Sequence, residues 1–210
     1  MAKNDPVFLE RTASGAILAE AATLLQERRT IFLMEQINVE TVNCAIRQLI
    51  ILDHQSDRPI TMVIGSPGGD IQQGLALMDV MQACRCTVRT VAVGLAASMA
   101  SVLLAAGTPG ERYCTKHSRV MIHEPLLNSG LSGSCSTIQE TAKHILERKE
   151  LLNKLLSSFT KRTRKEIEKA TAYDHYFSAE EAVAFGLVDH VTKREELMEL
   201  LGGVKEYDLG

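Results

Sequence analysis

Short apolar runs alternate along this chain with longer segments whose apolar residues recur at helical spacing. A short continuous apolar run is typical of a buried strand, and apolar positions three and four apart indicate one face of a helix. Three strand-helix units are predicted in succession: Thr30–Leu33 with Val39–Leu52, Ile60–Ile64 with Ile71–Ala83, and Val88–Val93 with Ser98–Ala106. This repetition predicts an α/β fold.

The second half of the chain continues the pattern with a longer helix. The predicted elements, in order, are a strand over Arg119–Ile122, a Gly- and Ser-rich loop or hairpin over Asn128–Ser136, a long helix over Thr137–Phe159, two short helices that begin after Thr163 and Ser178, and a strand over Leu187–Val191. Ser178 with Glu181 forms a capping-box pattern, and Gly186 is expected to end the second short helix.

The N-terminal residues lack a comparable pattern. Residues 1–14 are expected to form a mobile N-terminal arm, followed by a helix over Ile17–Glu27 with Ser14 as its cap. No long linker, repeat or shift in composition divides the chain, so a single domain over residues 1–210 is predicted.

Composition narrows the possible partners and the compartment. The formal net charge of −3 argues against nucleic acid as the main partner. No apolar run reaches membrane-spanning length, and the N-terminus lacks the pattern of a signal peptide. The five cysteines show no paired zinc spacing and are interpreted as reduced thiols, so we expect a cytoplasmic protein without a membrane partner.

The turn Ser66–Gly69, of sequence Ser-Pro-Gly-Gly, joins a predicted strand to a predicted helix. Its two glycines would let a ligand approach backbone N–H groups, as an oxyanion hole requires. Asp70 follows where a phosphate loop would carry Lys and Ser or Thr, which disfavours phosphate binding. A plain strand-to-helix turn is the alternative interpretation.

Ser98 lies in the segment Gly94–Ala100. This segment follows a predicted strand that is rich in β-branched residues, and it leads into a predicted helix of small residues. A hydroxyl at a helix N-terminus is favourably placed for a nucleophile, because the helix field and free N–H groups stabilise negative charge. An ordinary N-cap serine is the alternative. The segment does not match Gly-x-Ser-x-Gly, so an α/β-hydrolase elbow is disfavoured.

Two further residues could complete a catalytic site. His123 stands at the end of an apolar strand, just before the break at Pro125, where an imidazole can face a site. Asp174 lies in the connection between two short helices, from which a carboxylate could hold an imidazole. His175 is the competing histidine, and a surface-turn aspartate is the alternative for Asp174.

Taken in order, these segments resemble the family of Clp protease proteolytic subunits. The similarity rests on the Ser-Pro-Gly-Gly turn, Gly-x-Ala-Ala-Ser-Met, Met-Ile-His-x-Pro, and an aspartate before Ser-Ala-Glu-Glu-Ala, and it extends from about Ile17 to about Val191. The resemblance implies a serine endopeptidase in which Ser98 is the nucleophile, His123 the general base and Asp174 its orienting acid. It also implies an oxyanion hole formed by the N–H groups of Gly69 and Met99, with no metal or organic cofactor.

The resemblance further implies a fold and an assembly. The expected fold is that of Clp proteases and crotonases: repeated strand-helix units, with a hairpin and long helix over residues 128–160 that project and join two heptameric rings into a double ring. A Clp-type AAA+ ATPase would supply unfolded polypeptides to the enclosed chamber and consume ATP.

Several residues depart from the family's usual pattern. Met62 and Ala83 stand where aromatic residues commonly receive the ATPase, so weakened docking and a more aromatic partner paralogue in mixed rings are expected. Ala172 and Tyr173 stand where an acidic residue and an arginine commonly make ring-to-ring contacts. The alternatives are therefore an atypical or regulatory ring paralogue with weak activity of its own, and an acyl-CoA enzyme of the crotonase type, which would leave His123 and Asp174 unused.

Overall fold

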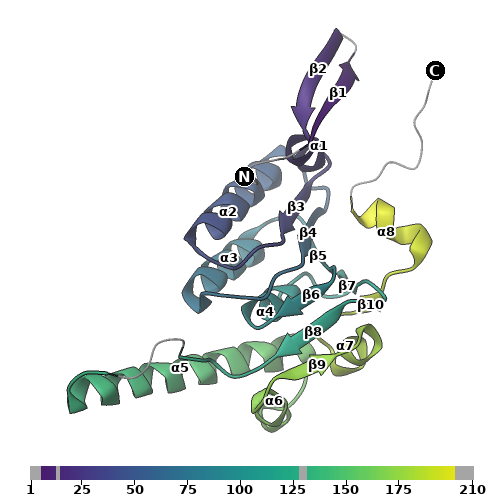
Figure 1. The fold of residues 1–210 in the computed structure, drawn as a ribbon. Coiled ribbons are helices and arrows are strands. Elements are labelled where there is room, and N and C mark those ends of the chain that lie inside the picture. Colours follow the sequence, from purple (N-terminus) through teal and green to yellow (C-terminus); the bar gives the residue numbers. More distant parts are fainter. Residues whose placement is uncertain (1–5, 13–14, 128–131, 202–210) are drawn as a thin grey trace.

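The computed structural model describes residues 6–12, 15–127 and 132–201 of the chain (Figure 1). The strands are β1 Val7–Thr12, β2 Gly15–Glu20, β3 Thr30–Leu33, β4 Ile60–Ile64, β5 Val88–Ala92, β6 Leu95–Ala97, β7 Arg112–Cys114, β8 Arg119–Ile122, β9 His175–Phe177 and β10 His190–Val191. The helices are α1 Ala21–Glu27, α2 Val39–Gln55, α3 Ile71–Ala83, α4 Met99–Ala105, α5 Cys135–Thr160, α6 Arg164–Thr171, α7 Ala179–Phe185 and α8 Arg194–Leu200.

Two sheets organise the core. Five parallel strands form the larger sheet in the order β10-β7-β5-β4-β3, and the smaller sheet has the order β6-β8-β9. In the smaller sheet β6 runs parallel to β8, whereas β9 runs antiparallel to it. Helices α2 and α3 lie side by side against the larger sheet, and α4 packs between them and the long helix α5 (Figure 1). The predicted α/β fold of repeated strand-helix units is confirmed.

Met62 lies in the middle of the larger sheet, where it pairs with Ile31 of β3 and Thr90 of β5. Its side chain has no exposed surface and belongs to the main hydrophobic core. The prediction that Met62 forms part of a surface docking pocket is therefore wrong, because a central strand covered on both faces leaves none of its residues exposed. Ala83, at the end of α3, is exposed as that prediction required.

The prediction of a helix beginning at Ile17 is also wrong. Strand β2 covers Gly15–Glu20 and pairs antiparallel with β1, and α1 begins only at Ala21. Backbone hydrogen bonds between two strands thus override a helical spacing of apolar residues, since a segment as short as Ile17–Glu27 has little intrinsic helical stability. The hairpin extends away from the two sheets (Figure 1), and Ser14 lies outside the described residues.

The other corrections concern short elements. Strands β6, β7 and β9 have three residues each and were not predicted, nor was α8. The predicted strand Leu187–Val191 shrinks to His190–Val191, because Leu187 and Val188 turn into the core directly after α7. The caps at Thr163 and Ser178 are confirmed, and Gly186 ends α7 with φ +94°.

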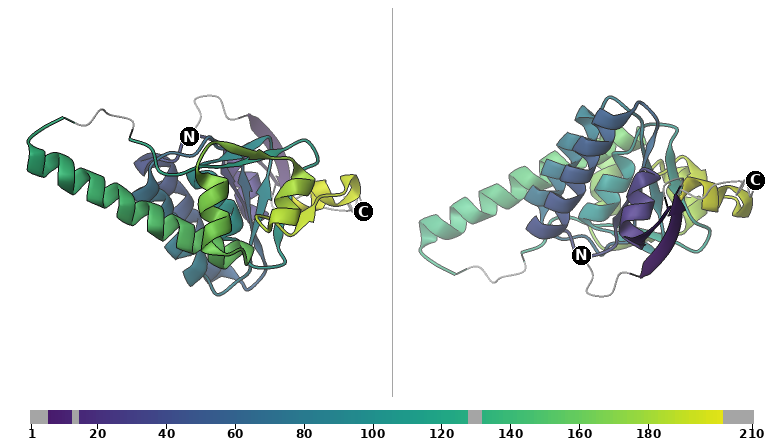
Figure 2. Two further views of the ribbon diagram at one scale, coloured as in Figure 1. Left: turned by 90° about the horizontal axis from the view of Figure 1, so that it is seen from below. Right: turned by 90° about the horizontal axis from the view of Figure 1, so that it is seen from above.

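The long helix α5 begins at Cys135 and extends well beyond the body of the molecule (Figure 2). The projecting long helix is therefore confirmed. The predicted hairpin over Asn128–Ser136 lies partly outside the described residues, and Ser132–Ser134 lead into the helix without regular structure.

Arg112, at the start of β7, and Asp189 link this strand to the segment between α7 and β10. The guanidinium donates to both carboxylate oxygens, at 2.9 and 2.6 Å, and to the backbone oxygens of Ala105, Phe159 and Gly186. Burial of Asp189 raises its pKa, but the hydrogen bonds and the charge of Arg112 outweigh that effect and hold it below its usual value.

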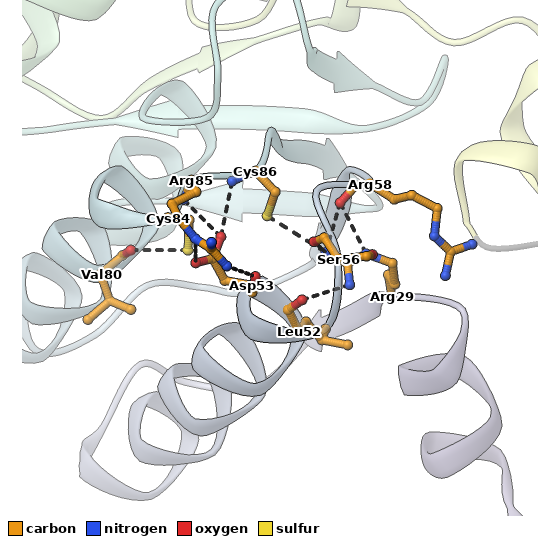
Figure 3. A network of polar contacts seen from close by, with 9 residues as sticks. All are labelled: Arg29, Leu52, Asp53, Ser56, Arg58, Val80, Cys84, Arg85 and Cys86. Carbon is orange, nitrogen blue, oxygen red and sulfur yellow. Dashed lines mark hydrogen bonds and ion pairs between the residues drawn. The ribbon is translucent and has the colours of Figure 1, made fainter.

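Arg29 joins the start of β3 to the end of α2 and the start of β4 (Figure 3). Its guanidinium donates to the backbone oxygens of Leu52, Ser56 and Arg58 at 2.7 to 3.1 Å, and the residue is 4% exposed. A cation at this place also complements the negative end of the helix dipole. Arg29 therefore stabilises the junction of three elements with one side chain.

Replacing Arg29 with methionine is expected to lower the free energy of unfolding by about 3 kcal/mol, because buried carbonyl groups lose their donor. Urea unfolding followed by circular dichroism measures the change. Arg47→Met is the matched control: Arg47 is exposed on α2 and, within the described ranges, donates only to the Asn43 oxygen of its own helix, so its loss should change stability by less than about 0.5 kcal/mol. Equal stability of the two variants would contradict this role for Arg29.

Candidate active site

Ser98 sits between the end of β6 and the start of α4 with φ 56° and ψ −127°. This region of backbone space is strained for a residue with a Cβ atom. The Ser98 side chain makes no capping hydrogen bond to α4, although the residue occupies the N-cap position. The interpretation as an ordinary N-cap serine therefore fails, and the hydroxyl is turned to another partner.

That partner is His123, the residue after β8. Its Nε2 lies 2.8 Å from Ser98 Oγ. Strands β6 and β8 are parallel with Ala97 opposite Met121, so the chain segments that leave them run side by side. The pairing of two short strands thus brings the serine and the histidine together.

Asp174 is brought to the other side of the imidazole by β9. This strand pairs antiparallel with β8, with His175 opposite Ile122, so the preceding residue lies across from His123. Asp174 Oδ1 is 3.7 Å from His123 Nδ1, too far for a normal hydrogen bond. Nδ1 is buried and has no hydrogen-bond partner within the described part of the chain, while the Asp174 side chain is 59% exposed.

The Ser66–Gly69 turn lies directly against Ser98. Gly68 has φ +92°, and a Cβ atom there would lie 2.6 Å from the Ala97 oxygen and 2.7 Å from the Ser98 Cβ. Gly69 has φ +150°, and its Cβ atom would lie 2.2 Å from the Ile37 oxygen. Glycine is therefore required at both positions by the backbone of this turn and by its contacts with Ile37 and Ser98.

Gly69 and Met99 line the same cavity as Ser98, so their backbone N–H groups are candidate donors. The Gly68 N–H donates to Ser66 Oγ at 3.1 Å, but among residues 6–12, 15–127 and 132–201 no acceptor pairs with the N–H of Gly69 or of Met99. Met99 directly follows Ser98 at the start of α4, where the first N–H groups of a helix are free. The two donors that the sequence predicted for an oxyanion hole are thus available to a ligand.

Ser98, His123 and Asp174 open onto one cavity of about 610 Å³. Its apolar wall is formed by Ile71, Met99, Val102, Ile122, Leu152 and Leu156, and its polar wall includes Asp70, Glu124, Arg148 and Asn153. The residues contributed by α5 were not singled out from the sequence. Only the packing of this helix beside α4 decides which of its faces meets the cavity.

The competing histidine lies elsewhere. His175 is exposed and stacks on Phe177, with ring centroids 4.2 Å apart. Among the described residues, no three or more His, Cys, Asp or Glu side chains are arranged to hold a metal ion. A search of the same residues finds no helix long and apolar enough to cross a membrane.

The strained backbone at Ser98 leads to a stability prediction. Ser98→Gly is expected to raise the free energy of unfolding relative to Ser98→Ala by about 1 kcal/mol, because glycine adopts positive φ without steric cost. Thermal unfolding of the two variants measures the difference. Both variants lack the hydroxyl, so the effect of its loss on stability cancels in the comparison. If alanine were the more stable of the two, this backbone would not be strained.

The chain was also compared with known protein families. The sequence model of the family described as Clp protease matches residues 14–195, which includes Ser98, His123, Asp174 and the Ser66–Gly69 turn. That range covers most of the 210 residues and both sheets. Members of this family are in general serine peptidases, although some are inactive. The chain therefore belongs to the Clp protease family.

Proposed function

We propose that this protein is a serine endopeptidase, the proteolytic subunit of an ATP-dependent Clp protease. The observation that carries the proposal is the 2.8 Å contact between Ser98 Oγ and His123 Nε2 beside two unpaired backbone donors. A hydroxyl is a weak nucleophile unless a base accepts its proton, and a neutral imidazole in this position can do so.

The geometry supports the following sequence of steps. Ser98 Oγ attacks the carbonyl carbon of a peptide bond while its proton passes to His123 Nε2. The N–H groups of Gly69 and Met99 stabilise the oxyanion that forms. His123 then donates the proton to the departing amine, which leaves an acyl-serine ester. Water, deprotonated by the same imidazole, attacks the ester and restores the free hydroxyl.

Asp174 is proposed to hold the Nδ1–H of His123 during these steps, which sets the tautomer and stabilises the imidazolium. In the single chain the two atoms are 3.7 Å apart, so the carboxylate must move closer for this hydrogen bond to form. The two residues before it, Ala172 and Tyr173, are exposed, and Tyr173 is 86% exposed. We propose that contacts made there on assembly close the gap.

The assembly that we propose is a heptameric ring, paired face to face through α5 into a double ring with an enclosed chamber. Several large apolar side chains are exposed on the elements that would make the contacts: Val39, Ile50 and Ile51 on α2, and Ile138, Leu146 and Leu151 on α5. Exposed apolar groups of this kind favour association with further subunits. Unfolded polypeptides delivered by a Clp-type AAA+ ATPase in the cytoplasm would be the substrates.

A regulatory ring paralogue with weak activity of its own is the second candidate, and the open contact between His123 and Asp174 favours it. A paralogue in mixed rings could then supply the alignment of Asp174 that this chain lacks by itself. The crotonase-type alternative is disfavoured, because coenzyme A chemistry of that kind gives the Ser98–His123 contact no role.

A fluorophosphonate probe tests the proposed function. Such probes phosphonylate an activated serine and leave ordinary hydroxyl groups unmodified, so we expect labelling at Ser98, found by peptide mass spectrometry. His123→Ala should slow labelling at least about 100-fold. His144→Ala should not, since His144 is exposed on α5 and its ion-pair partners among the described residues are glutamates of its own helix.

Sedimentation of the labelled protein extends this test to assembly. The label should be enriched in ring-sized species, because the contact with Asp174 is proposed to close there. Equal labelling rates for His123→Ala and the parental protein, with both assembled, would refute the assignment of the base. Equal labelling of monomers and rings would refute the role of assembly.

A further inference from the structure

Glu124 directly follows the proposed general base, at the point where the chain leaves the sheet. Strand β8 ends at Ile122, so His123 and the residues after it lie outside the strand pairing. Pro125 has no N–H group to donate, and Leu126 is 63% exposed. On this side of His123, the path of the backbone therefore depends on the contacts that hold Glu124.

The first of these contacts is a backbone hydrogen bond. The Glu124 N–H donates to the Thr171 oxygen at 2.8 Å. Thr171 is the last residue of α6, is 1% exposed, and lies shortly before Asp174 in the chain. The hydrogen bond thus joins the segment that carries the histidine of the site to the segment that carries the aspartate.

The second contact is an ion pair with the long helix. Lys149 Nζ on α5 donates to Glu124 Oε2, across 25 positions of the chain. The two side chains are 36% and 38% exposed, so the pair is partly shielded from water and is less screened than a pair on the open surface. Within the described ranges, Glu124 makes no other ion pair. Lys149 therefore decides where the Glu124 carboxylate lies.

We propose that Lys149 is a positioning residue for His123 and acts through the carboxylate of Glu124. The ion pair holds the chain beyond β8 against α5, so that the imidazole keeps its 2.8 Å contact with Ser98. Without Lys149, one of the two anchors is lost and the imidazole moves more freely relative to the serine. Lys149 does not line the active-site cavity, so its role concerns the rate of the chemical step and not the binding of a peptide. This role rests on the proposed peptidase function.

Lys149→Met tests the proposal, because it removes the charge and keeps most of the aliphatic stem. On assembled protein it should lower kcat for a short fluorogenic peptide about tenfold and leave KM within about twofold, since a small displacement of a catalytic group slows the chemical step. Lys143→Met is the matched control. Lys143 lies on the same helix and pairs with Glu140, but its side chain is 64% exposed and it does not line the cavity. Its kcat should be unchanged.

A second variant separates positioning from the effect of an unpaired charge. Lys149→Met leaves a carboxylate without its cation near the imidazole, whereas Glu124→Met breaks the same ion pair and leaves no carboxylate. If the pair positions His123, Glu124→Met and the double variant should both show about the same tenfold loss of kcat, because the two residues act as one unit. Recovery of the parental kcat in the double variant would overturn the proposal. Glu124→Met serves alone if Lys149→Met does not assemble.

The rate at which a fluorophosphonate labels Ser98 distinguishes a failure of this inference from a failure of the proposed function. A parental protein that neither hydrolyses the peptide nor reacts with the probe refutes both. An active parental protein, with full kcat and full labelling rate in Lys149→Met, refutes the positioning role alone. A labelling rate that falls about tenfold together with kcat, in rings that sediment like the parental ones, supports it.

Discussion

Ser98→Ala should reduce the turnover of a short fluorogenic peptide by about 10⁴- to 10⁶-fold, to the residual level set by substrate binding and the oxyanion donors. The hydroxyl that His123 contacts is removed, while alanine keeps a Cβ atom and the same strained backbone. The fold and the assembly should therefore persist. Steady-state kinetics on assembled protein, with ring formation checked by sedimentation, measure the effect.

Ser158→Ala is the matched control for that variant. Ser158 is exposed on α5, and its hydroxyl donates to the Leu155 oxygen of the same helix. It is not one of the residues that line the active-site cavity. Its turnover should stay within about twofold of the parental value. If Ser98→Ala kept more than a tenth of the parental turnover, the peptidase activity would reside elsewhere and the proposed function would fail.

Asp174→Asn should lower kcat by about 10³- to 10⁴-fold and leave KM nearly unchanged. An asparagine can present its N–H to Nδ1 of His123, which favours the tautomer whose Nε2 carries the proton and cannot accept one from Ser98. Because Nδ1 is buried and has no other partner among the residues that the structure describes, none of these places a second group to correct the tautomer. The measurement is kcat and KM of assembled rings over a range of peptide concentration.

Asp70→Asn controls for the loss of one negative charge from the same cavity. Asp70 caps α3 by accepting the Gln73 N–H, and asparagine can cap equally well. Its effect on kcat should be below about tenfold. Equal effects of Asp70→Asn and Asp174→Asn would show that Asp174 acts only through the charge of the cavity and does not orient the imidazole.

Much of the fold could be predicted because its elements are local. β4 and α3 have the bounds that the pattern predicted, since a run of buried strand residues and a capped apolar helix each carry their signal within a few residues. The three-residue strands β6, β7 and β9 could not be predicted, because strands of that length exist only through the partners with which they pair. The segment Ile17–Glu20 was wrongly predicted as helix for the same reason, because its strand structure depends on pairing with β1.

The sequence by itself determined the strand-helix order, the helix caps, and which serine, histidine and aspartate are candidates for chemistry, because motif order and residue type are properties of the linear chain. Tertiary structure alone decided the distances: that Ser98 meets His123 at 2.8 Å, and that Asp174 stops 3.7 Å away. It also decided burial, placing Met62 in the core and Asn153 at the cavity. Both depend on which faces of distant elements come together, and residues far apart along the chain carry no local signal of that contact.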